Sequence, residues 1–106
     1  MIELVHPFSL GNDKVIERIL EDDQVGINHM ILPKGERLPE HRANATVYMV
    51  VARGEVSLQL EDQEAHVYPA GSILVIPFHT QMNVLQHGSD TTELFVLKSP
   101  SPRGNK

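Results

Sequence analysis

Turn-forming residues recur along this chain at short, regular intervals, and this spacing limits the fold more than any other feature. Most of the clusters contain Gly, Pro, Asn or Asp, the residues that tight turns favour. The clusters occupy residues 11–13, 21–26, 33–36, 53–55, 61–64, 69–71, 77–79 and 87–90. Because the segments between them have the length of single strands, the sequence predicts a mainly β fold.

The segments between the turns also have the composition of strands. They are, in order, INHMIL, TVYMVV, VSLQL, SILVI, NVLQ and ELFVL, and β-branched side chains are common in them. Apolar and polar residues alternate over 56–60, which predicts one buried face and one exposed face. After Ser72, the segment 72–76 is entirely apolar, which predicts a strand that is covered on both faces.

One segment, KVIERILED at residues 14–22, fits two local structures. Its apolar residues have helical spacing, so a short helix and a strand are both compatible with it. The acidic turn that follows favours the strand, because the strand could then form a hairpin with residues 25–32. We expect a strand here.

Length and composition exclude several classes of protein. A chain of 106 residues has the length of one domain. A net charge of −5 with nine Lys and Arg and no basic run argues against nucleic acid as a partner. There is no cysteine, which excludes disulfides and thiolate metal sites. No signal peptide or membrane span is evident, so we expect a cytoplasmic protein without a membrane partner.

The number of strands favours a closed arrangement. About seven to nine short strands fit a small barrel or a two-sheet roll better than an open sheet, which would leave its edges exposed. We expect a single domain over residues 1–98. The last segment, 99–106, has two prolines and little to bury, so we expect a loose C-terminal tail.

Five residues have the spacing of the two sequence motifs of the cupins. Gly35, His41 and Gly54 match framework positions of the first motif, and Gly71 and Pro77 match the second. The chain therefore resembles a small single-domain cupin of the RmlC-like kind. This resemblance implies an all-β jelly-roll barrel, the double-stranded β-helix, over nearly the whole domain.

The metal-binding positions of those motifs are mostly changed. The first motif ordinarily supplies two His and one Glu, and the second supplies a further His. Here His41 occupies the first position, but the other three hold Ala43, Val47 and Met82. One imidazole and one thioether cannot hold Zn, Fe or Mn tightly. The resemblance therefore implies a degenerate metal centre, and we expect no cofactor.

Other histidines leave an alternative open. His29 lies in a neighbouring strand segment, and His79 follows the turn at Pro77. Together with His41 they would form a three-histidine site for Zn, Fe, Mn or Ni. The chain would then be a metal-dependent cupin enzyme, of the dioxygenase or isomerase type, with relocated ligands.

We expect instead that the barrel interior binds a small, largely apolar molecule. The period of a strand places residues 41, 43, 45 and 47 on one face, which the resemblance makes the interior. The candidate ligand-binding residues are His41, Val47, Tyr48, Met82 and Asn83. His41 could equally be a structural residue at the rim of a strand, bonded to the neighbouring backbone.

Two further expectations concern assembly. A barrel without any ligand, with a role in assembly or regulation, is a third hypothesis. Small cupins commonly form homodimers, often through their N-terminal strands, and the apolar residues of 14–20 could serve such a contact. The resemblance thus implies a homodimer.

Overall fold

The protein is an all-β domain in the computed structural model, which describes residues 1–103. Within these residues there are nine strands and no helix, so the predicted fold class is confirmed. No helix long and apolar enough to cross a membrane occurs in this part of the chain. The strands are β1 (Val15–Glu21), β2 (Gly26–Leu32), β3 (His41–Arg42), β4 (Val47–Arg53), β5 (Glu55–Leu60), β6 (His66–Pro69), β7 (Ile73–Ile76), β8 (Gln81–His87) and β9 (Thr92–Lys98).

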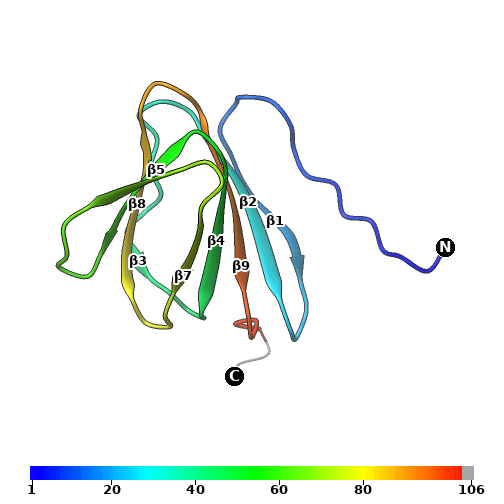
Figure 1. Ribbon diagram of the computed structural model, residues 1–106. Coiled ribbons are helices and arrows are strands. Elements are labelled where there is room, and N and C mark those ends of the chain that lie inside the picture. The colour runs from blue at the N-terminus through cyan, green and yellow to red at the C-terminus, as the bar shows by residue number, and fades with distance from the viewer. Residues whose placement is uncertain (104–106) are drawn as a thin grey trace.

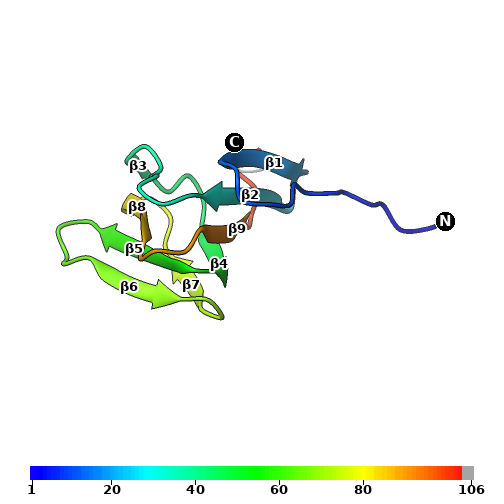
Figure 2. The ribbon, with the colours of Figure 1, turned by 90° about the horizontal axis from the view of Figure 1, so that it is seen from above.

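The strands form two antiparallel sheets that face each other (Figure 1). The larger sheet has the order β1-β2-β9-β4-β7, and the smaller has the order β3-β8-β5-β6. Several neighbours, such as β2 with β9 and β5 with β8, are far apart in sequence. Figure 2, from above, shows the sheets as the two walls of a flattened barrel. This is the arrangement that the predicted jelly roll requires.

The core lies between the two sheets, and strand alternation determines which side chains enter it. Val56 and Leu58 of β5 point inward, as their alternation predicts, and are at most 2% exposed. The buried apolar side chains that pack together are Met30, Leu32, Leu38, Ala43, Val47, Met49, Val51, Val56, Leu58, Ile76, Met82, Val84, Leu94 and Val96.

The segment that fitted both a helix and a strand is a strand. β1 pairs antiparallel with β2, so the predicted hairpin is confirmed. Its turn is closed by Asp22, whose Oδ1 accepts hydrogen bonds from the backbone N–H groups of Gln24 and Val25, both at 2.8 Å. These bonds, that of Val25 foremost, hold the pKa of Asp22 below its ordinary value.

Strand β7 is not covered on both faces, so that prediction was wrong. It lies at the edge of the larger sheet, and its outward side chains Ile73 and Val75 are 67% and 60% exposed. Only the alternate residues, Leu74 and Ile76, contact the core. An apolar strand at a sheet edge therefore leaves an exposed apolar surface.

Part of the predicted C-terminal tail packs against the β1–β2 turn. Ser101 is fully buried, and its backbone N–H donates to the carbonyl of Gln24 at 3.1 Å. The Arg103 guanidinium donates to the carbonyl of Glu21 at 2.8 Å. Residues 99–103 are thus tied to the domain, and residues 104–106 of the predicted tail lie outside the described residues.

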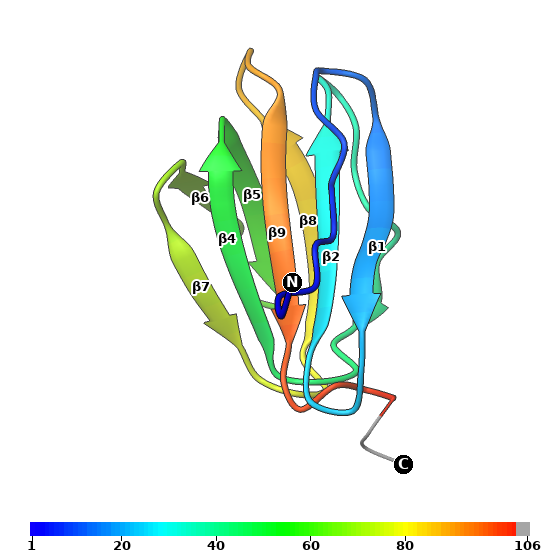
Figure 3. The same ribbon diagram turned by 90° about the vertical axis from the view of Figure 1, so that its right-hand side faces the viewer.

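The N-terminal segment crosses the outer face of the larger sheet before β1 begins (Figure 3). Arg53 of β4 anchors it, because its guanidinium donates to the carbonyl of Gly11 at 2.7 Å and to Asn12 Oδ1 at 2.5 Å. The first residues of the chain then point away from the barrel (Figure 1). Their large apolar side chains are exposed, and these are Met1, Ile2, Leu4 and Val5.

Candidate functional site

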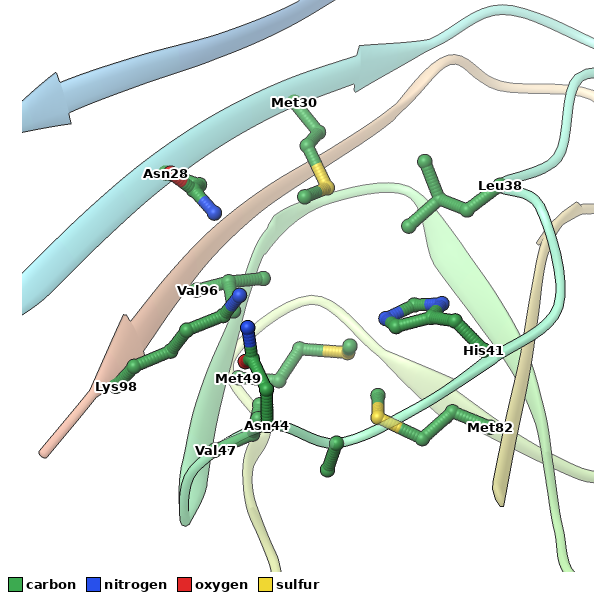
Figure 4. A pocket seen from close by; sticks show the side chains of 11 residues that line it. Asn28, Met30, Leu38, His41, Asn44, Val47, Met49, Met82, Val96 and Lys98 are labelled. Carbon is green, nitrogen blue, oxygen red and sulfur yellow. The ribbon is translucent and has the colours of Figure 1, made fainter. Parts of the chain in front are cut away.

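A small cavity lies between the sheets, at the end of the barrel where β9 ends and β3 begins. Its volume is about 40 Å³. Most of its wall is apolar and consists of Met30, Leu38, Ala43, Val47, Met49, Met82 and Val96. Its polar lining is Asn28, His41, Asn44 and Lys98. Figure 4 shows these side chains, with the sulfur atoms of three methionines around the space.

The size of the cavity limits what it can hold without rearrangement. On the same measure of volume, a water molecule needs about 10–15 Å³. A space of about 40 Å³ therefore corresponds to roughly three waters, or to an organic molecule of a few non-hydrogen atoms. Larger ligands would require the flexible methionine side chains to move.

His41 lies at the mouth of the cavity. The residue as a whole is exposed to solvent, yet its ring forms part of the cavity wall (Figure 4). The Nδ1 atom is 2.8 Å from the carbonyl oxygen of Pro39, which can only accept a hydrogen bond. Nδ1 therefore carries the hydrogen, and a neutral ring would leave Nε2 as an acceptor. His41 is thus a backbone-bonded rim residue whose ring also faces the cavity, and its contact with a ligand stays a prediction.

Three polar side chains opposite His41 were not predicted as site residues from the sequence. Asn28, Asn44 and Lys98 line the other side of the cavity, and their side chains converge in Figure 4. Lys98 is half-buried, and this burial lowers the pKa of its amine. Nearby Arg18 lowers the pKa further, while Glu21 opposes the shift.

Comparison with known proteins identifies the barrel. No protein-family model matches the chain. An uncharacterized protein of Methanocaldococcus jannaschii is 41% identical over 104 residues, which cover 97% of this chain and 90% of the relative. Its crystal structure, described as an RmlC-like cupin family protein with a double-stranded β-helix fold, superposes with a TM-score of 0.94 over 97% of this chain and 95% of the other. The chain belongs to the RmlC-like cupin family.

More distant cupins share the fold alone. A cupin superfamily protein from Desulfitobacterium hafniense is 16% identical and has a TM-score of 0.72, with 88% of this chain and 83% of that chain covered. A cupin-like protein from Thermotoga maritima is 13% identical and has a TM-score of 0.74, with 80% and 67% covered. The predicted family and fold are thus confirmed.

The residues at the cupin metal positions do not fit a metal ion. Ala43, Val47 and Met82 are at most 3% exposed and pack in the apolar core. Only His41 offers a nitrogen ligand there, whereas a stable site needs about three protein ligands. Among residues 1–103, no three His, Cys, Asp or Glu side chains gather in a way that could hold a metal.

The predicted three-histidine site is not assembled either. His41 borders the cavity, but His29 is buried on the outer face of the larger sheet. His79 is exposed in the β7–β8 loop, where its ring lies 4.0 Å from that of Phe78. Strand alternation explains why the three histidines do not meet. Asn28 and Met30 face the interior, so His29 between them faces the outside.

Three of the five predicted ligand-binding residues, His41 among them, line the cavity, and two do not. Met82 and Val47 are part of its wall. Tyr48 lies on the outer face of β4 and is 38% exposed, because it alternates with the inward Val47. Asn83 likewise points outward from β8, where its Oδ1 accepts a hydrogen bond of 2.6 Å from Arg37. Tyr48 and Asn83 are therefore outside this site.

His29 instead joins a polar cluster beneath the N-terminal segment. The ring is fully buried between Phe8 and Phe95, with centroid distances of 4.8 and 4.7 Å. Its Nδ1 is 2.7 Å from Glu17 Oε2, and its Nε2 is 2.6 Å from Glu93 Oε2. Carboxylates only accept hydrogen bonds, so both ring nitrogens donate, as in the charged imidazolium.

The charges of this cluster balance. Arg53 Nε lies 3.2 Å from Glu93 Oε1, so two cations face two carboxylates. Glu17 also accepts hydrogen bonds from the backbone and side chain of Ser9, at 2.9 and 3.0 Å. The backbone bond from Ser9, followed by the bond from His29, lowers the pKa of Glu17. The cluster therefore fastens the N-terminal segment to the sheet, and it has no opening to the barrel cavity.

Proposed function

We propose that this cupin binds a small, largely apolar molecule in the barrel interior. The observation that carries the proposal is the cavity, whose wall is mainly apolar and whose few polar groups are His41 on one side and Asn28, Asn44 and Lys98 on the other. That combination is typical of small-molecule sites, where polar groups fix the orientation of the ligand. Methionine side chains also adapt their shape to an irregular ligand.

The three cavity methionines allow a direct test by NMR. Met30, Met49 and Met82 line the cavity, while Met1 is 99% exposed in the N-terminal segment. In protein labelled with ¹³C at the methionine methyl groups, titration with ethanol or propan-1-ol as neutral probes is expected to shift the three cavity signals. The Met1 signal serves as the internal control and should stay in place.

Shortening one wall should change which probe binds best. Met49→Ala enlarges the cavity, so butan-1-ol should gain affinity relative to ethanol, by roughly fourfold for each CH₂ group that is newly buried. Val51→Ala is the matched control, because Val51 is equally buried, at 1% exposure, but does not line the cavity. Met49→Val is a milder second variant. Unchanged cavity signals with every probe would contradict the proposal and favour a role in assembly without a ligand.

We also propose that two copies of the chain form a homodimer. One copy has two exposed apolar surfaces: the first residues of the chain, and the outer face of β4 and β7 with Tyr48, Ile73 and Val75. The N-terminal segment of the same copy leaves the sheet without covering that face (Figure 3). The N-terminal residues of a second copy are the occupant that we propose for it.

Light scattering coupled to gel filtration tests this assembly. The unmodified chain is expected to have twice the monomer mass, and the double variant Ile73→Lys, Val75→Lys should have the monomer mass. Val67→Lys is the control, because Val67 is exposed on β6 of the other sheet. A monomeric unmodified chain, or a dimer that survives the double change, would overturn the proposed interface.

A further inference from the structure

We propose that the ligand of the barrel cavity is a short-chain monocarboxylate, whose carboxylate contacts Lys98, Asn28 and Asn44. Its short apolar end would then face the methionine side of the cavity. This inference rests on the proposed function, which it refines by naming the chemical class of the ligand.

The first argument is the lack of partners for these polar groups. None of the ion pairs among residues 1–103 includes Lys98, although its side chain is half-buried. Neither Asn28 nor Asn44 forms a side-chain hydrogen bond within the same residues. All three end at the same side of one cavity (Figure 4). Three side chains that can donate hydrogen bonds, none of them bonded to another protein side chain, are therefore available at one place to an oxygen-bearing ligand.

The second argument is charge. Burial acts against the charged form of the Lys98 amine, and the nearby Arg18 adds to this effect. Glu21 is the one carboxylate that opposes it, but Glu21 Oε2 lies 3.8 Å from Arg18 Nε. An anionic ligand would add a counter-charge to that of Glu21 and favour the charged form of Lys98. Two amide groups can donate further hydrogen bonds to the same carboxylate.

The third argument is size. A cavity of about 40 Å³ corresponds to roughly three water molecules, so a carboxylate with one or two further carbons fits best. Such a ligand has a carboxylate end and an apolar end. The first would lie beside Lys98, and the second beside Met30, Met49 and Met82. Polyvalent anions fit poorly, because most of the wall cannot hydrogen-bond to them.

The test compares propionate with propan-1-ol and propionamide, using the methyl signals of the cavity methionines. The three probes have similar sizes, and only propionate carries a charge. Propionate is expected to bind about tenfold more tightly than propan-1-ol, because the alcohol lacks the charged carboxylate that accepts hydrogen bonds. Lys98→Met should remove the preference for the charged probe, so that this variant binds propionate no more tightly than propan-1-ol. Lys34→Met, at an exposed loop position, is the matched control.

Two further measurements keep the inference falsifiable. Asn44→Ala changes an exposed residue and should weaken propionate binding about threefold, whether or not Lys98→Met folds. Saturation with propionate should also raise the pKa of Lys98, measured from its ¹³Cε signal. Equal binding of propionate and propan-1-ol would overturn the carboxylate inference and preserve the proposed function. If none of the three probes shifts the cavity signals, both proposals fail.

Discussion

Replacement of His29 by alanine is expected to lower the free energy of unfolding by about 3–5 kcal/mol, the usual result of removing one partner from a buried charge cluster. Two carboxylates, of Glu17 and Glu93, would lose a cation from both sides of one ring. The stacking surface of Phe8 and Phe95 would be lost with it. For a domain of this size the melting temperature should fall by about 15 °C or more.

Calorimetry or circular dichroism measures this effect, and two variants separate its causes. His66→Ala is the control, because His66 is exposed on β6 and its removal should change the stability by less than about 0.5 kcal/mol. His29→Phe keeps an aromatic ring but leaves both carboxylates without their donor. If the charge cluster is what matters, His29→Phe will lose most of the stability that His29→Ala loses. A loss no larger than that of His66→Ala would show that the cluster contributes nothing.

Gly54→Ala should be the second strongly destabilising change, with a loss of about 3 kcal/mol. Gly54 has a φ of +70°, which L side chains rarely adopt. An added Cβ would also overlap the backbone carbonyl oxygen of Thr91 and approach its carbonyl carbon to 3.0 Å. Because the obstacle is backbone, β4 and β9 would have to separate at their ends.

Gly71→Ala distinguishes strain from overlap. Gly71 has a φ of +94°, but a Cβ there would meet nothing within 4 Å. Its substitution should therefore cost only the conformational strain, about 1–2 kcal/mol. Urea unfolding of the two variants gives the comparison directly. Equal losses of stability at both glycines would mean that the Thr91 backbone moves aside at no cost in free energy.

Much of the architecture was predictable because it depends on local signals. Closely spaced turns limited the elements to short strands, and the acidic turn after residue 20 favoured the β1–β2 hairpin. The framework spacing around Gly54 and Pro77 led to the correct family, since these residues shape the turns of the barrel. The edge position of β7 was not predictable, because an apolar strand has the same sequence whether or not another layer covers it.

The site was predicted less well, for reasons of strand parity. Tyr48 and Asn83 can form hydrogen bonds and adjoin Val47 and Met82 in sequence, but adjacent residues on a strand face opposite sides. The same alternation, applied from Met30 and Val96, would have placed Asn28 and Lys98 inside the barrel. The pairing of His29 with two carboxylates depends on three strands and could not be read from any one of them.

The apolar packing at positions 43, 47 and 82 also makes a metal site difficult to build there by single substitutions. Val47→Glu alone would place a carboxylate in the core with no cation beside it, and Met82→His alone would bury a lone imidazole. Each ligand would be useful only when the others are present, so each single change would lower the stability without creating a metal site. A chain with this core should therefore accept apolar substitutions at these positions more readily than a stepwise introduction of metal ligands.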